Sequence, residues 1–133
     1  MLRWDDKALI ARVRAAALRG VTAGTHMVDA EAVRLIMQTS KTGRVYKRGA
    51  VVHQASAPGE APASDTGRLV QSRTVDILPD ELKGRLTFHT DYAAKLEFGT
   101  AKMESRPYAR QALRSKQAAV QAVIAAEVGK VIA

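Results

Sequence analysis

Apolar residues recur at helical spacing in the first part of the chain. An acid near a helix N-terminus accepts hydrogen bonds from unpaired amides and suits the helix dipole, so Asp5 or Asp6 can begin a helix here. A second helical run follows at 29–39. The pattern predicts one long helix, with a bend or break between Gly20 and Thr25 as the alternative. The positions on one face, spaced by four, three, four and seven residues, are Leu9, Val13, Ala16, Gly20 and Met27.

The middle of this helical face is made of small residues. They are Ala16, Ala17, Gly20, Ala23 and Gly24. A glycine inside a helix costs about 1 kcal/mol relative to alanine, so we expect a compensating contact. Small side chains let a neighbouring backbone approach closely, which is the compensation that we predict.

The last part of the chain has the clearest helical pattern. Its apolar stripe falls within an arc of roughly 40° at 3.6 residues per turn, and Ala109 and Val128 widen it. Pro107 suits the first position of a helix, because its φ is fixed and its missing N–H would be unpaired there. We predict a helix over 107–132, with the stripe in the core and Arg110 on the polar face. The stripe consists of Leu113, Val120, Ile124 and Val131.

Three strand-like runs lie between the helices. Residues 44–54 are rich in β-branched side chains around Gly49, which indicates a bulge or a tight turn. Residues 73–78 and 82–90 alternate in polarity and are joined by Pro-Asp, as in an antiparallel hairpin. We therefore predict a sheet of at least three strands. Gly43 is expected to end the first helix in a left-handed conformation.

Together these elements predict an α+β fold. A long N-terminal helix and a C-terminal helix are expected to pack on one face of a small, mostly antiparallel sheet. The length, 133 residues, fits a single domain over 1–133. Between the strand runs, Leu69 and Val70 of a short element at 68–72 are expected to enter the core.

A loop without periodicity occupies 55–64, with the sequence ASAPGEAPAS. Its composition supports a flexible contact arm and plain disorder equally. The candidate contact residues in this loop are Pro58, Gly59, Glu60 and Pro62.

The formal net charge of +8 allows several kinds of partner. A basic balance suits nucleic acid, an acidic membrane face or an acidic protein, and it is also common on solvated surfaces. The densest basic group, and therefore the candidate basic contact, is Lys41, Arg44, Lys47 and Arg48. Aromatic residues make up 5% of the chain, whereas a binder of single strands offers several stacking aromatics.

Several classes of function are not expected from this sequence. No apolar run reaches the roughly 18 residues of a membrane span, and the first residues do not read as a signal peptide. There is no cysteine, and the three histidines are scattered, so we expect no disulfide and no metal site. No nucleophile has its base nearby and no nucleotide-binding loop is present, so we expect neither enzymatic activity nor a cofactor.

The segment YAAKLEFGTAKMESRPYAR reads as the junction between the sheet and the last helix. We expect Gly99 to take a positive φ and so end the run before it. We expect Phe98 to be buried, and Glu97 to pair with Arg106 or to contact a helix end. The candidate residues, as a structural junction or a protein interface, are Tyr92, Glu97, Phe98, Gly99, Thr100, Met103, Arg106 and Pro107.

This segment also resembles the signature of the HK-ninety-seven-type gene-ten-product family. The shared features are YAxxxEFGT, then Met103, then RPY at 106–108 and Ala-Leu at 112–113. Upstream, SAPGEAPASDTGRL resembles the proline-rich loop and the Thr-Gly-x-Leu segment of the same family. Two positions depart from the family pattern, with Tyr108 where phenylalanine is commoner and Gln111 where proline is expected.

Members of that family are small tail or neck components of tailed bacteriophages and prophages. The resemblance implies a structural virion protein at the head–tail junction or tail end, present in the virion and, during assembly, in the host cytoplasm. The implied partners are head-completion, tail-terminator or tail-tube proteins and further copies in a homo-oligomeric ring, with DNA nearby and no membrane. The alternative is a small basic nucleic-acid-binding domain, which needs a contiguous basic face.

Overall fold

The computed structural model describes residues 6–38, 41, 43, 45–48, 51–57, 60, 67–102 and 104–132. In chain order, the elements are α1 (Asp6–Met37), β1 (Val45–Arg48), β2 (Val51–Gln54), α2 (Arg68–Gln71), β3 (Arg73–Leu78), the 3-10 helix η1 (Pro79–Glu81), β4 (Lys83–Phe88), α3 (Ala93–Phe98) and α4 (Ala109–Ile132).

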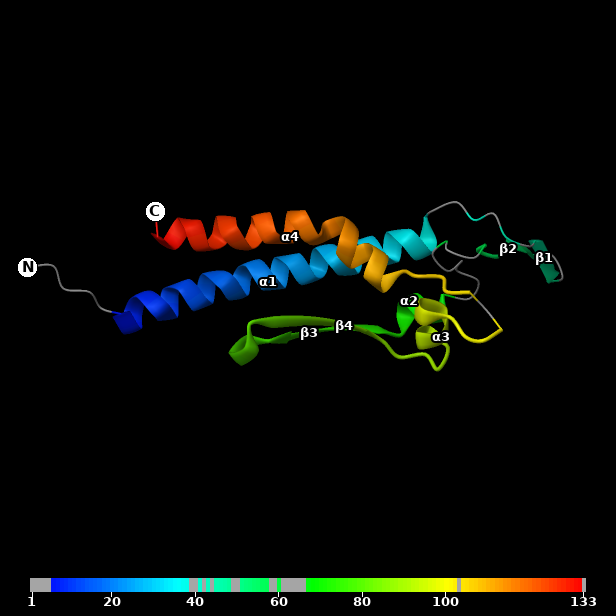
Figure 1. Ribbon diagram of the computed structural model, residues 1–133, viewed down its shortest axis with the longest axis horizontal. Coiled ribbons are helices and arrows are strands. Elements are labelled where there is room, and N and C mark those ends of the chain that lie inside the picture. The colour runs from blue at the N-terminus through cyan, green and yellow to red at the C-terminus, as the bar shows by residue number, and fades with distance from the viewer. Residues whose placement is uncertain are drawn as a thin grey trace, which may run out of the picture.

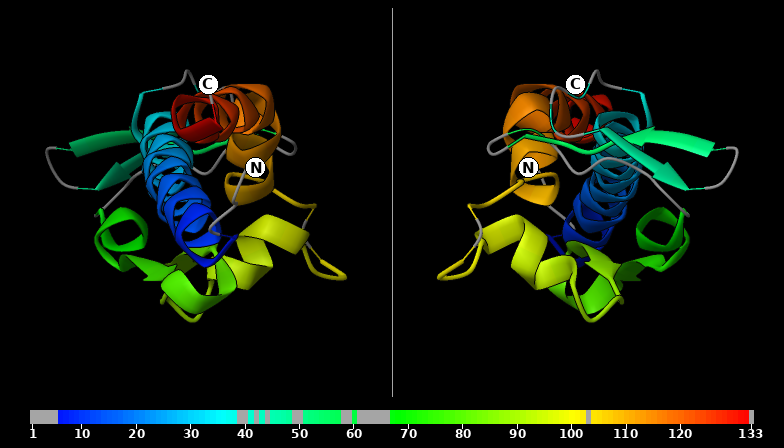
Figure 2. Two further views of the ribbon diagram at one scale, coloured as in Figure 1. Left: turned by 90° about the vertical axis from the view of Figure 1, so that its left-hand side faces the viewer. Right: turned by 90° about the vertical axis from the view of Figure 1, so that its right-hand side faces the viewer.

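The long helix α1 is the middle layer of an elongated molecule. Helix α4 runs antiparallel along one side of α1, and the β3–β4 hairpin lies along the other side (Figure 1). The end-on views show α1 and α4 crossing side by side, with the hairpin, α2 and α3 below them (Figure 2). The predicted α+β class, with both long helices packed on a small antiparallel sheet, is therefore confirmed.

The small face of α1 is where α4 approaches. A Cβ atom built on Gly20 would lie 2.7 Å from the Cα of Ile124, and one on Gly24 would lie 2.6 Å from Cγ1 of Val120. Hydrogen in place of a side chain is thus what lets the two helices come this close. Near the same crossing, Nε of Arg19 lies 3.2 Å from Oε2 of Glu127. Helix α1 is unbroken, so the alternative of a break between Gly20 and Thr25 is wrong.

The β3–β4 hairpin follows the prediction. Val75 lies opposite Leu86 and Ile77 opposite Gly84, so these residues share one face of the sheet. A side chain at Gly84 would overlap Thr25 of α1, which shows how closely helix and strand pack. Arg73 of β3 also donates from Nε to Oδ1 of Asp29 in α1, at 2.6 Å.

The predicted three-stranded sheet is wrong. Strands β1 and β2 pair with each other, with Val45 opposite Gln54, and form a second two-stranded sheet. The base of this hairpin is closed on itself, because the backbone N–H of Gly43 donates to the carbonyl of Ala55 at 2.9 Å. Gly43 is not a helix cap either, since α1 ends at Met37 and the φ of Gly43 is not positive.

The hydrophobic core is small and lies where the C-terminal half of α1 meets α2, α3 and the start of α4. Leu69 is buried in it and Val70 packs against it, as predicted. Ile36 and Tyr108 are large side chains that are almost completely buried. The stripe of α4 is less buried than predicted, because Leu113 remains 54% exposed. The buried members of the core are Ala32, Leu35, Ile36, Leu69, Ala93, Tyr108 and Ala112.

We predict that Gly20→Ala lowers the free energy of unfolding by about 1 to 2 kcal/mol, although alanine is the better helix former. The added methyl group would meet the backbone of α4, which can yield only if the helices separate. Gly129→Ala is the matched control in α4, because no atom lies within 4 Å of the Cβ position there. It should raise stability by up to about 1 kcal/mol in urea unfolding. Equal effects of the two substitutions would contradict the close approach.

Candidate functional site

The junction is built around Glu97, in the last turn of α3. Glu97 is 5% exposed, and the helix ends directly after Phe98. Gly99 has a φ of 76° and a ψ of 177°, which turns the chain away from the helix axis. A side chain would be strained at this φ, so the sequence prediction for Gly99 is confirmed.

The carboxylate of Glu97 receives the first amides of α4. Oε2 accepts from the backbone N–H of Tyr108 at 2.9 Å and of Ala109 at 3.0 Å, and Oε1 accepts from that of Arg110 at 2.9 Å. These amides come before the first turn is complete and have no partner within the helix. The acid also lies at the positive end of the helix dipole. Glu97 therefore caps a helix that begins more than ten residues further along the chain.

Arg110 completes this cap. Its Nε donates to Oε1 of Glu97 at 2.9 Å, and its Nη2 donates to the backbone carbonyl of Glu97 at 2.7 Å. The backbone carbonyl is an acceptor at the C-terminal end of α3, where a cation is favourable. One arginine thus neutralises the buried carboxylate and satisfies the end of the preceding helix. We call Glu97, Arg110 and the three amides the corner clamp.

The pKa of Glu97 reflects two opposing influences. Burial of the carboxylate raises it, whereas the backbone hydrogen bonds from Tyr108, Arg110 and Ala109 and the Arg110 guanidinium lower it. The hydrogen bonds prevail, so the pKa lies below its ordinary value of 4.5. Glu97 is therefore ionised at neutral pH, in the form that can accept all of these bonds.

Tyr108 joins the clamp to the core. Its side chain is almost completely buried, and its hydroxyl donates to the carbonyl of Ala93 at 3.0 Å. Its ring meets that of Phe88 edge-on, with centroids 4.8 Å apart. Burial raises the pKa of Tyr108 to about 12, with the charge of Glu97 as the next cause. Helices α3 and α4 and strand β4 therefore meet at one ring.

The predicted burial of Phe98 is wrong, and of the two contacts predicted for Glu97 the structure shows the one with a helix end. Phe98 is 66% exposed, because the short helix α3 buries Ala93 and Glu97, four residues apart, and Phe98 lies outside that face. The Arg110 guanidinium lies over the Phe98 ring, 4.8 Å from its centroid. Arg106 is not the partner of Glu97; its backbone N–H instead donates to the carbonyl of Leu96 at 2.6 Å. The helix-end contact predicted as the alternative is the one that Glu97 makes.

The remaining residues of the predicted junction lie outside the corner clamp. Tyr92 precedes α3 and packs against the core, with the Arg68 guanidinium 5.9 Å from its ring centroid. Thr100 is exposed, and its hydroxyl accepts from the backbone N–H of Lys102 at 3.3 Å. Pro107 lies two residues before α4 rather than at its first position. Met103 lies outside the described residues.

The candidate contact arm and the candidate basic contact are only partly described. Pro58, Gly59, Pro62 and Arg44 lie outside the described residues, and Lys47 and Arg48 are described only as part of β1. Oε2 of Glu60 accepts from the backbone N–H of Ala57 at 2.9 Å. Lys41 donates from Nζ to the carbonyl of Leu35 at 2.7 Å, and burial lowers the pKa of its amine. Lys41 thus supports the C-terminal end of α1.

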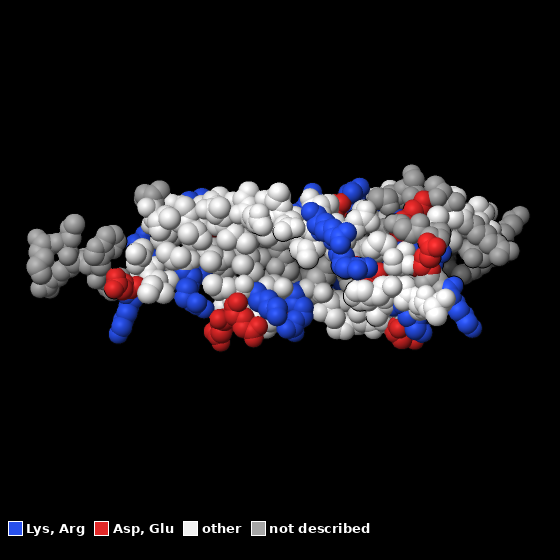
Figure 3. All heavy atoms as spheres, in the orientation of Figure 1, with Lys and Arg blue, Asp and Glu red and all other residues white. Residues whose placement is uncertain are grey.

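Charges of both signs are interspersed on the face of the molecule shown in Figure 3. Three carboxylates in α1 and α4 form ion pairs with arginine. The nitrogen–oxygen distances are 2.6 Å for Glu31 with Arg34, 2.6 Å for Asp29 with Arg73 and 3.2 Å for Glu127 with Arg19. Across the described residues, no three side chains of His, Cys, Asp or Glu gather closely enough to hold a metal ion. Neither long helix contains a stretch apolar enough to cross a membrane.

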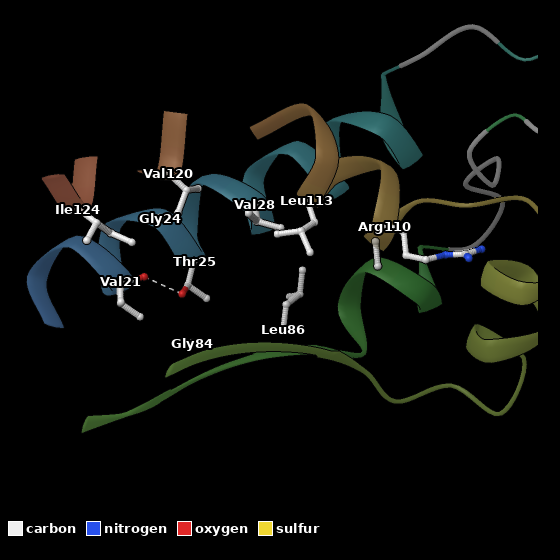
Figure 4. A pocket seen from close by; sticks show the side chains of 11 residues that line it. Val21, Gly24, Thr25, Val28, Gly84, Leu86, Arg110, Leu113, Val120 and Ile124 are labelled. Atoms are coloured by element: carbon white, nitrogen blue, oxygen red, sulfur yellow. Dashed lines mark hydrogen bonds between the residues drawn. The ribbon is translucent and has the colours of Figure 1, made fainter. Parts of the chain in front are cut away.

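The sequence did not indicate an apolar groove of about 390 Å³ between α4 and β4. Helix α1 forms its floor, α4 one wall and β4 the other (Figure 4). Arg110, at one end, is its one charged residue. The signal in the sequence was the apolar stripe of α4, which the fold leaves only partly buried. The groove's larger apolar side chains are Val21, Val28, Leu86, Leu113, Val120 and Ile124.

Searches of protein-family models, curated proteins and solved structures found no match to this chain.

We predict that Glu97→Gln lowers the free energy of unfolding by about 2 kcal/mol at pH 7, because a neutral amide accepts fewer bonds and leaves buried donors unpaired. The pKa of Glu97 is lowered on folding, so its contribution is fully present above the ordinary pKa of 4.5. The contribution is lost as the pH falls through the folded-state pKa. Urea unfolding of both proteins between pH 7 and pH 3 should show the difference shrinking towards acid. A difference independent of pH would contradict the clamp.

We predict that Phe98→Ala lowers the free energy of unfolding by less than about 1 kcal/mol, because the ring is exposed and loses mainly its contact with Arg110. Tyr108→Ala removes a buried ring and should cost about 3 to 5 kcal/mol. Thermal unfolding of the two variants compares them directly. A loss for Phe98→Ala as large as that for Tyr108→Ala would show that Phe98 is part of the core.

Proposed function

We propose that this chain is a structural subunit of a tailed phage or prophage virion. It acts at the head–tail junction or the tail end, where several copies form a ring and contact head-completion, tail-terminator or tail-tube proteins. The proposal has two parts, an assembly role and a place in the virion, and each rests on a different observation.

The observation that carries the assembly role is how little of α4 the chain covers. Within α4, all of which the structure describes, Ala112 is the one buried residue. Large apolar side chains remain exposed at Ile10, Met37, Leu113 and Ile132. Apolar surface of this kind is typical of proteins that bury it against partners.

The place in the virion is supported by the resemblance of the junction segment to a family of tail and neck components. The geometry supplies a physical reason for that motif. Glu97 caps α4, Gly99 ends α3, and Tyr108 fills the corner between them. A sequence that keeps these residue types together would keep this corner, and with it the direction in which α4 leaves the sheet.

The nucleic-acid-binding alternative has less support from the described residues. A contiguous basic face would give salt-dependent binding. Instead, Arg19, Arg34 and Arg73 each face an acid, and Lys41 donates to the end of α1. The net charge of +8 suits an acidic protein partner in the same assembly.

An in-frame deletion of the coding sequence in the genome that carries it tests the proposal. Electron microscopy of induced lysates should show filled heads and tails that are not joined, or tails of abnormal length. A plasmid copy of the wild-type sequence should restore infectious particles. Particles of normal form and number after the deletion would overturn the proposal. Strong, salt-dependent DNA binding by the purified chain would then favour the alternative.

A further inference from the structure

The apolar groove is bordered by an unpaired strand edge. Among the residues that the structure describes, β3 and β4 pair only with each other. Gly84 and Leu86 of β4 line the groove, whereas no residue of β3 does, so the edge of β4 away from β3 runs beside it (Figure 4). Such an edge presents backbone donors and acceptors that a further strand can pair with.

One face of the β1–β2 hairpin carries two exposed valines, beside Gln54 and Lys47. Val45 is 57% exposed and Val52 is 64% exposed. Val45 lies opposite Gln54, and Val52 is two residues from Gln54, so both valines point to the same side of the hairpin. An isolated two-stranded hairpin is marginally stable in water, and a third strand or an apolar surface against this face would stabilise it.

The hairpin lies away from the groove of its own chain. Lys41 bonds to the carbonyl of Leu35, and Gly43 bonds to Ala55, so the base of the hairpin is held at the C-terminal end of α1. From there β1 and β2 lie beyond the end of the paired helices (Figure 1). The groove lies along the middle of α1, where Val21, Gly24, Thr25 and Val28 line it. A second copy can bring the two surfaces together without disturbing these contacts.

We propose that the β1–β2 hairpin of one copy docks in the apolar groove of the next copy. One hairpin strand adds to the edge of β4, and Val45 and Val52 cover Leu113 and Leu86. Each half of this contact is a different surface of the same chain. Such a head-to-tail contact closes into a ring when the rotation between copies allows it, and otherwise forms a filament. The inference rests on the proposed function, because it supplies the contact between the subunits of the ring.

Cross-linking tests the contact directly, because the chain contains no cysteine of its own. The double variant Val52→Cys with Leu113→Cys should form disulfide-linked dimers and larger species under mild oxidation. The matched control is Val52→Cys with Ala122→Cys. Ala122 is exposed and lies on the face of α4 opposite to Leu113. We expect at least about tenfold more cross-linked product from the first pair. Equal yields from the two pairs would overturn the proposal.

Mixing two variants tests whether the contact is head-to-tail. Val45→Asp with Val52→Asp disables the hairpin, and Leu113→Asp disables the groove; all three residues are exposed, so the fold should survive. Each variant alone should self-associate at least about tenfold more weakly than the wild type in sedimentation analysis. An equal mixture should form dimers of one copy each and nothing larger. A wild type that stays monomeric, or a mixture without dimers, would overturn the inference.

Complementation separates this inference from the proposed function. If the deletion abolishes joined particles and neither the hairpin variant nor the groove variant restores them, the proposed function and the docking of the hairpin both stand. If the deletion abolishes joined particles but Leu113→Asp restores them fully, the proposed function stands and the docking of the hairpin is wrong. If the deletion has no effect on particles, the proposed function is wrong, and the cross-linking yields then decide the contact on their own.

Discussion

The fold depends on one buried carboxylate that serves two helices. Glu97 lies at the end of α3, yet its oxygens accept the amides that begin α4. A buried ionised group is costly unless its bonds are made, and here three amides and a guanidinium make them. The clamp fixes where α4 starts and in which direction it leaves. That direction lays α4 against the glycines of α1, where its backbone comes closest.

The same arrangement leaves much of the chain uncovered. Helix α1 has neighbours on both sides, whereas α4 and the β3–β4 hairpin each contact it on one side only. The core is concentrated at the clamp end of the molecule, and the groove lies between α4 and β4 (Figure 4). A protein built this way gains further burial from copies of itself or other partners, which is why we interpret it as an assembly subunit.

The elements could be predicted because their signals are local. Periodicity gave α1 and α4, alternation gave the β3–β4 hairpin, and the need for a positive φ gave Gly99. The errors concern choices made in three dimensions. Arg106 and Arg110 are both basic residues near the start of α4, and only the direction of the corner decides that Arg110 meets Glu97.

The exposure of Phe98 and the pairing of 45–54 were missed for a related reason. Hydrophobicity favours burial of Phe98, but a helix as short as α3 has one inward face, and Glu97 occupies it. Strand propensity at 45–54 does not say which strand is the partner, and the nearest partner in sequence was the other half of the same segment. The groove was missed because the stripe of α4 was assigned wholly to the core, whereas the space beside it depends on how α4 and β4 both pack against α1.

Hydrogen exchange of the backbone amides of Tyr108, Ala109 and Arg110 tests the clamp most directly. Amides in the first turn of a helix usually exchange quickly, because they lack a partner within the helix. The clamp predicts that these three amides exchange as slowly as those in the middle of α4, and that Glu97→Ala makes them fast while the middle of α4 stays protected. Fast exchange in the wild type would contradict the clamp as the basis of the fold.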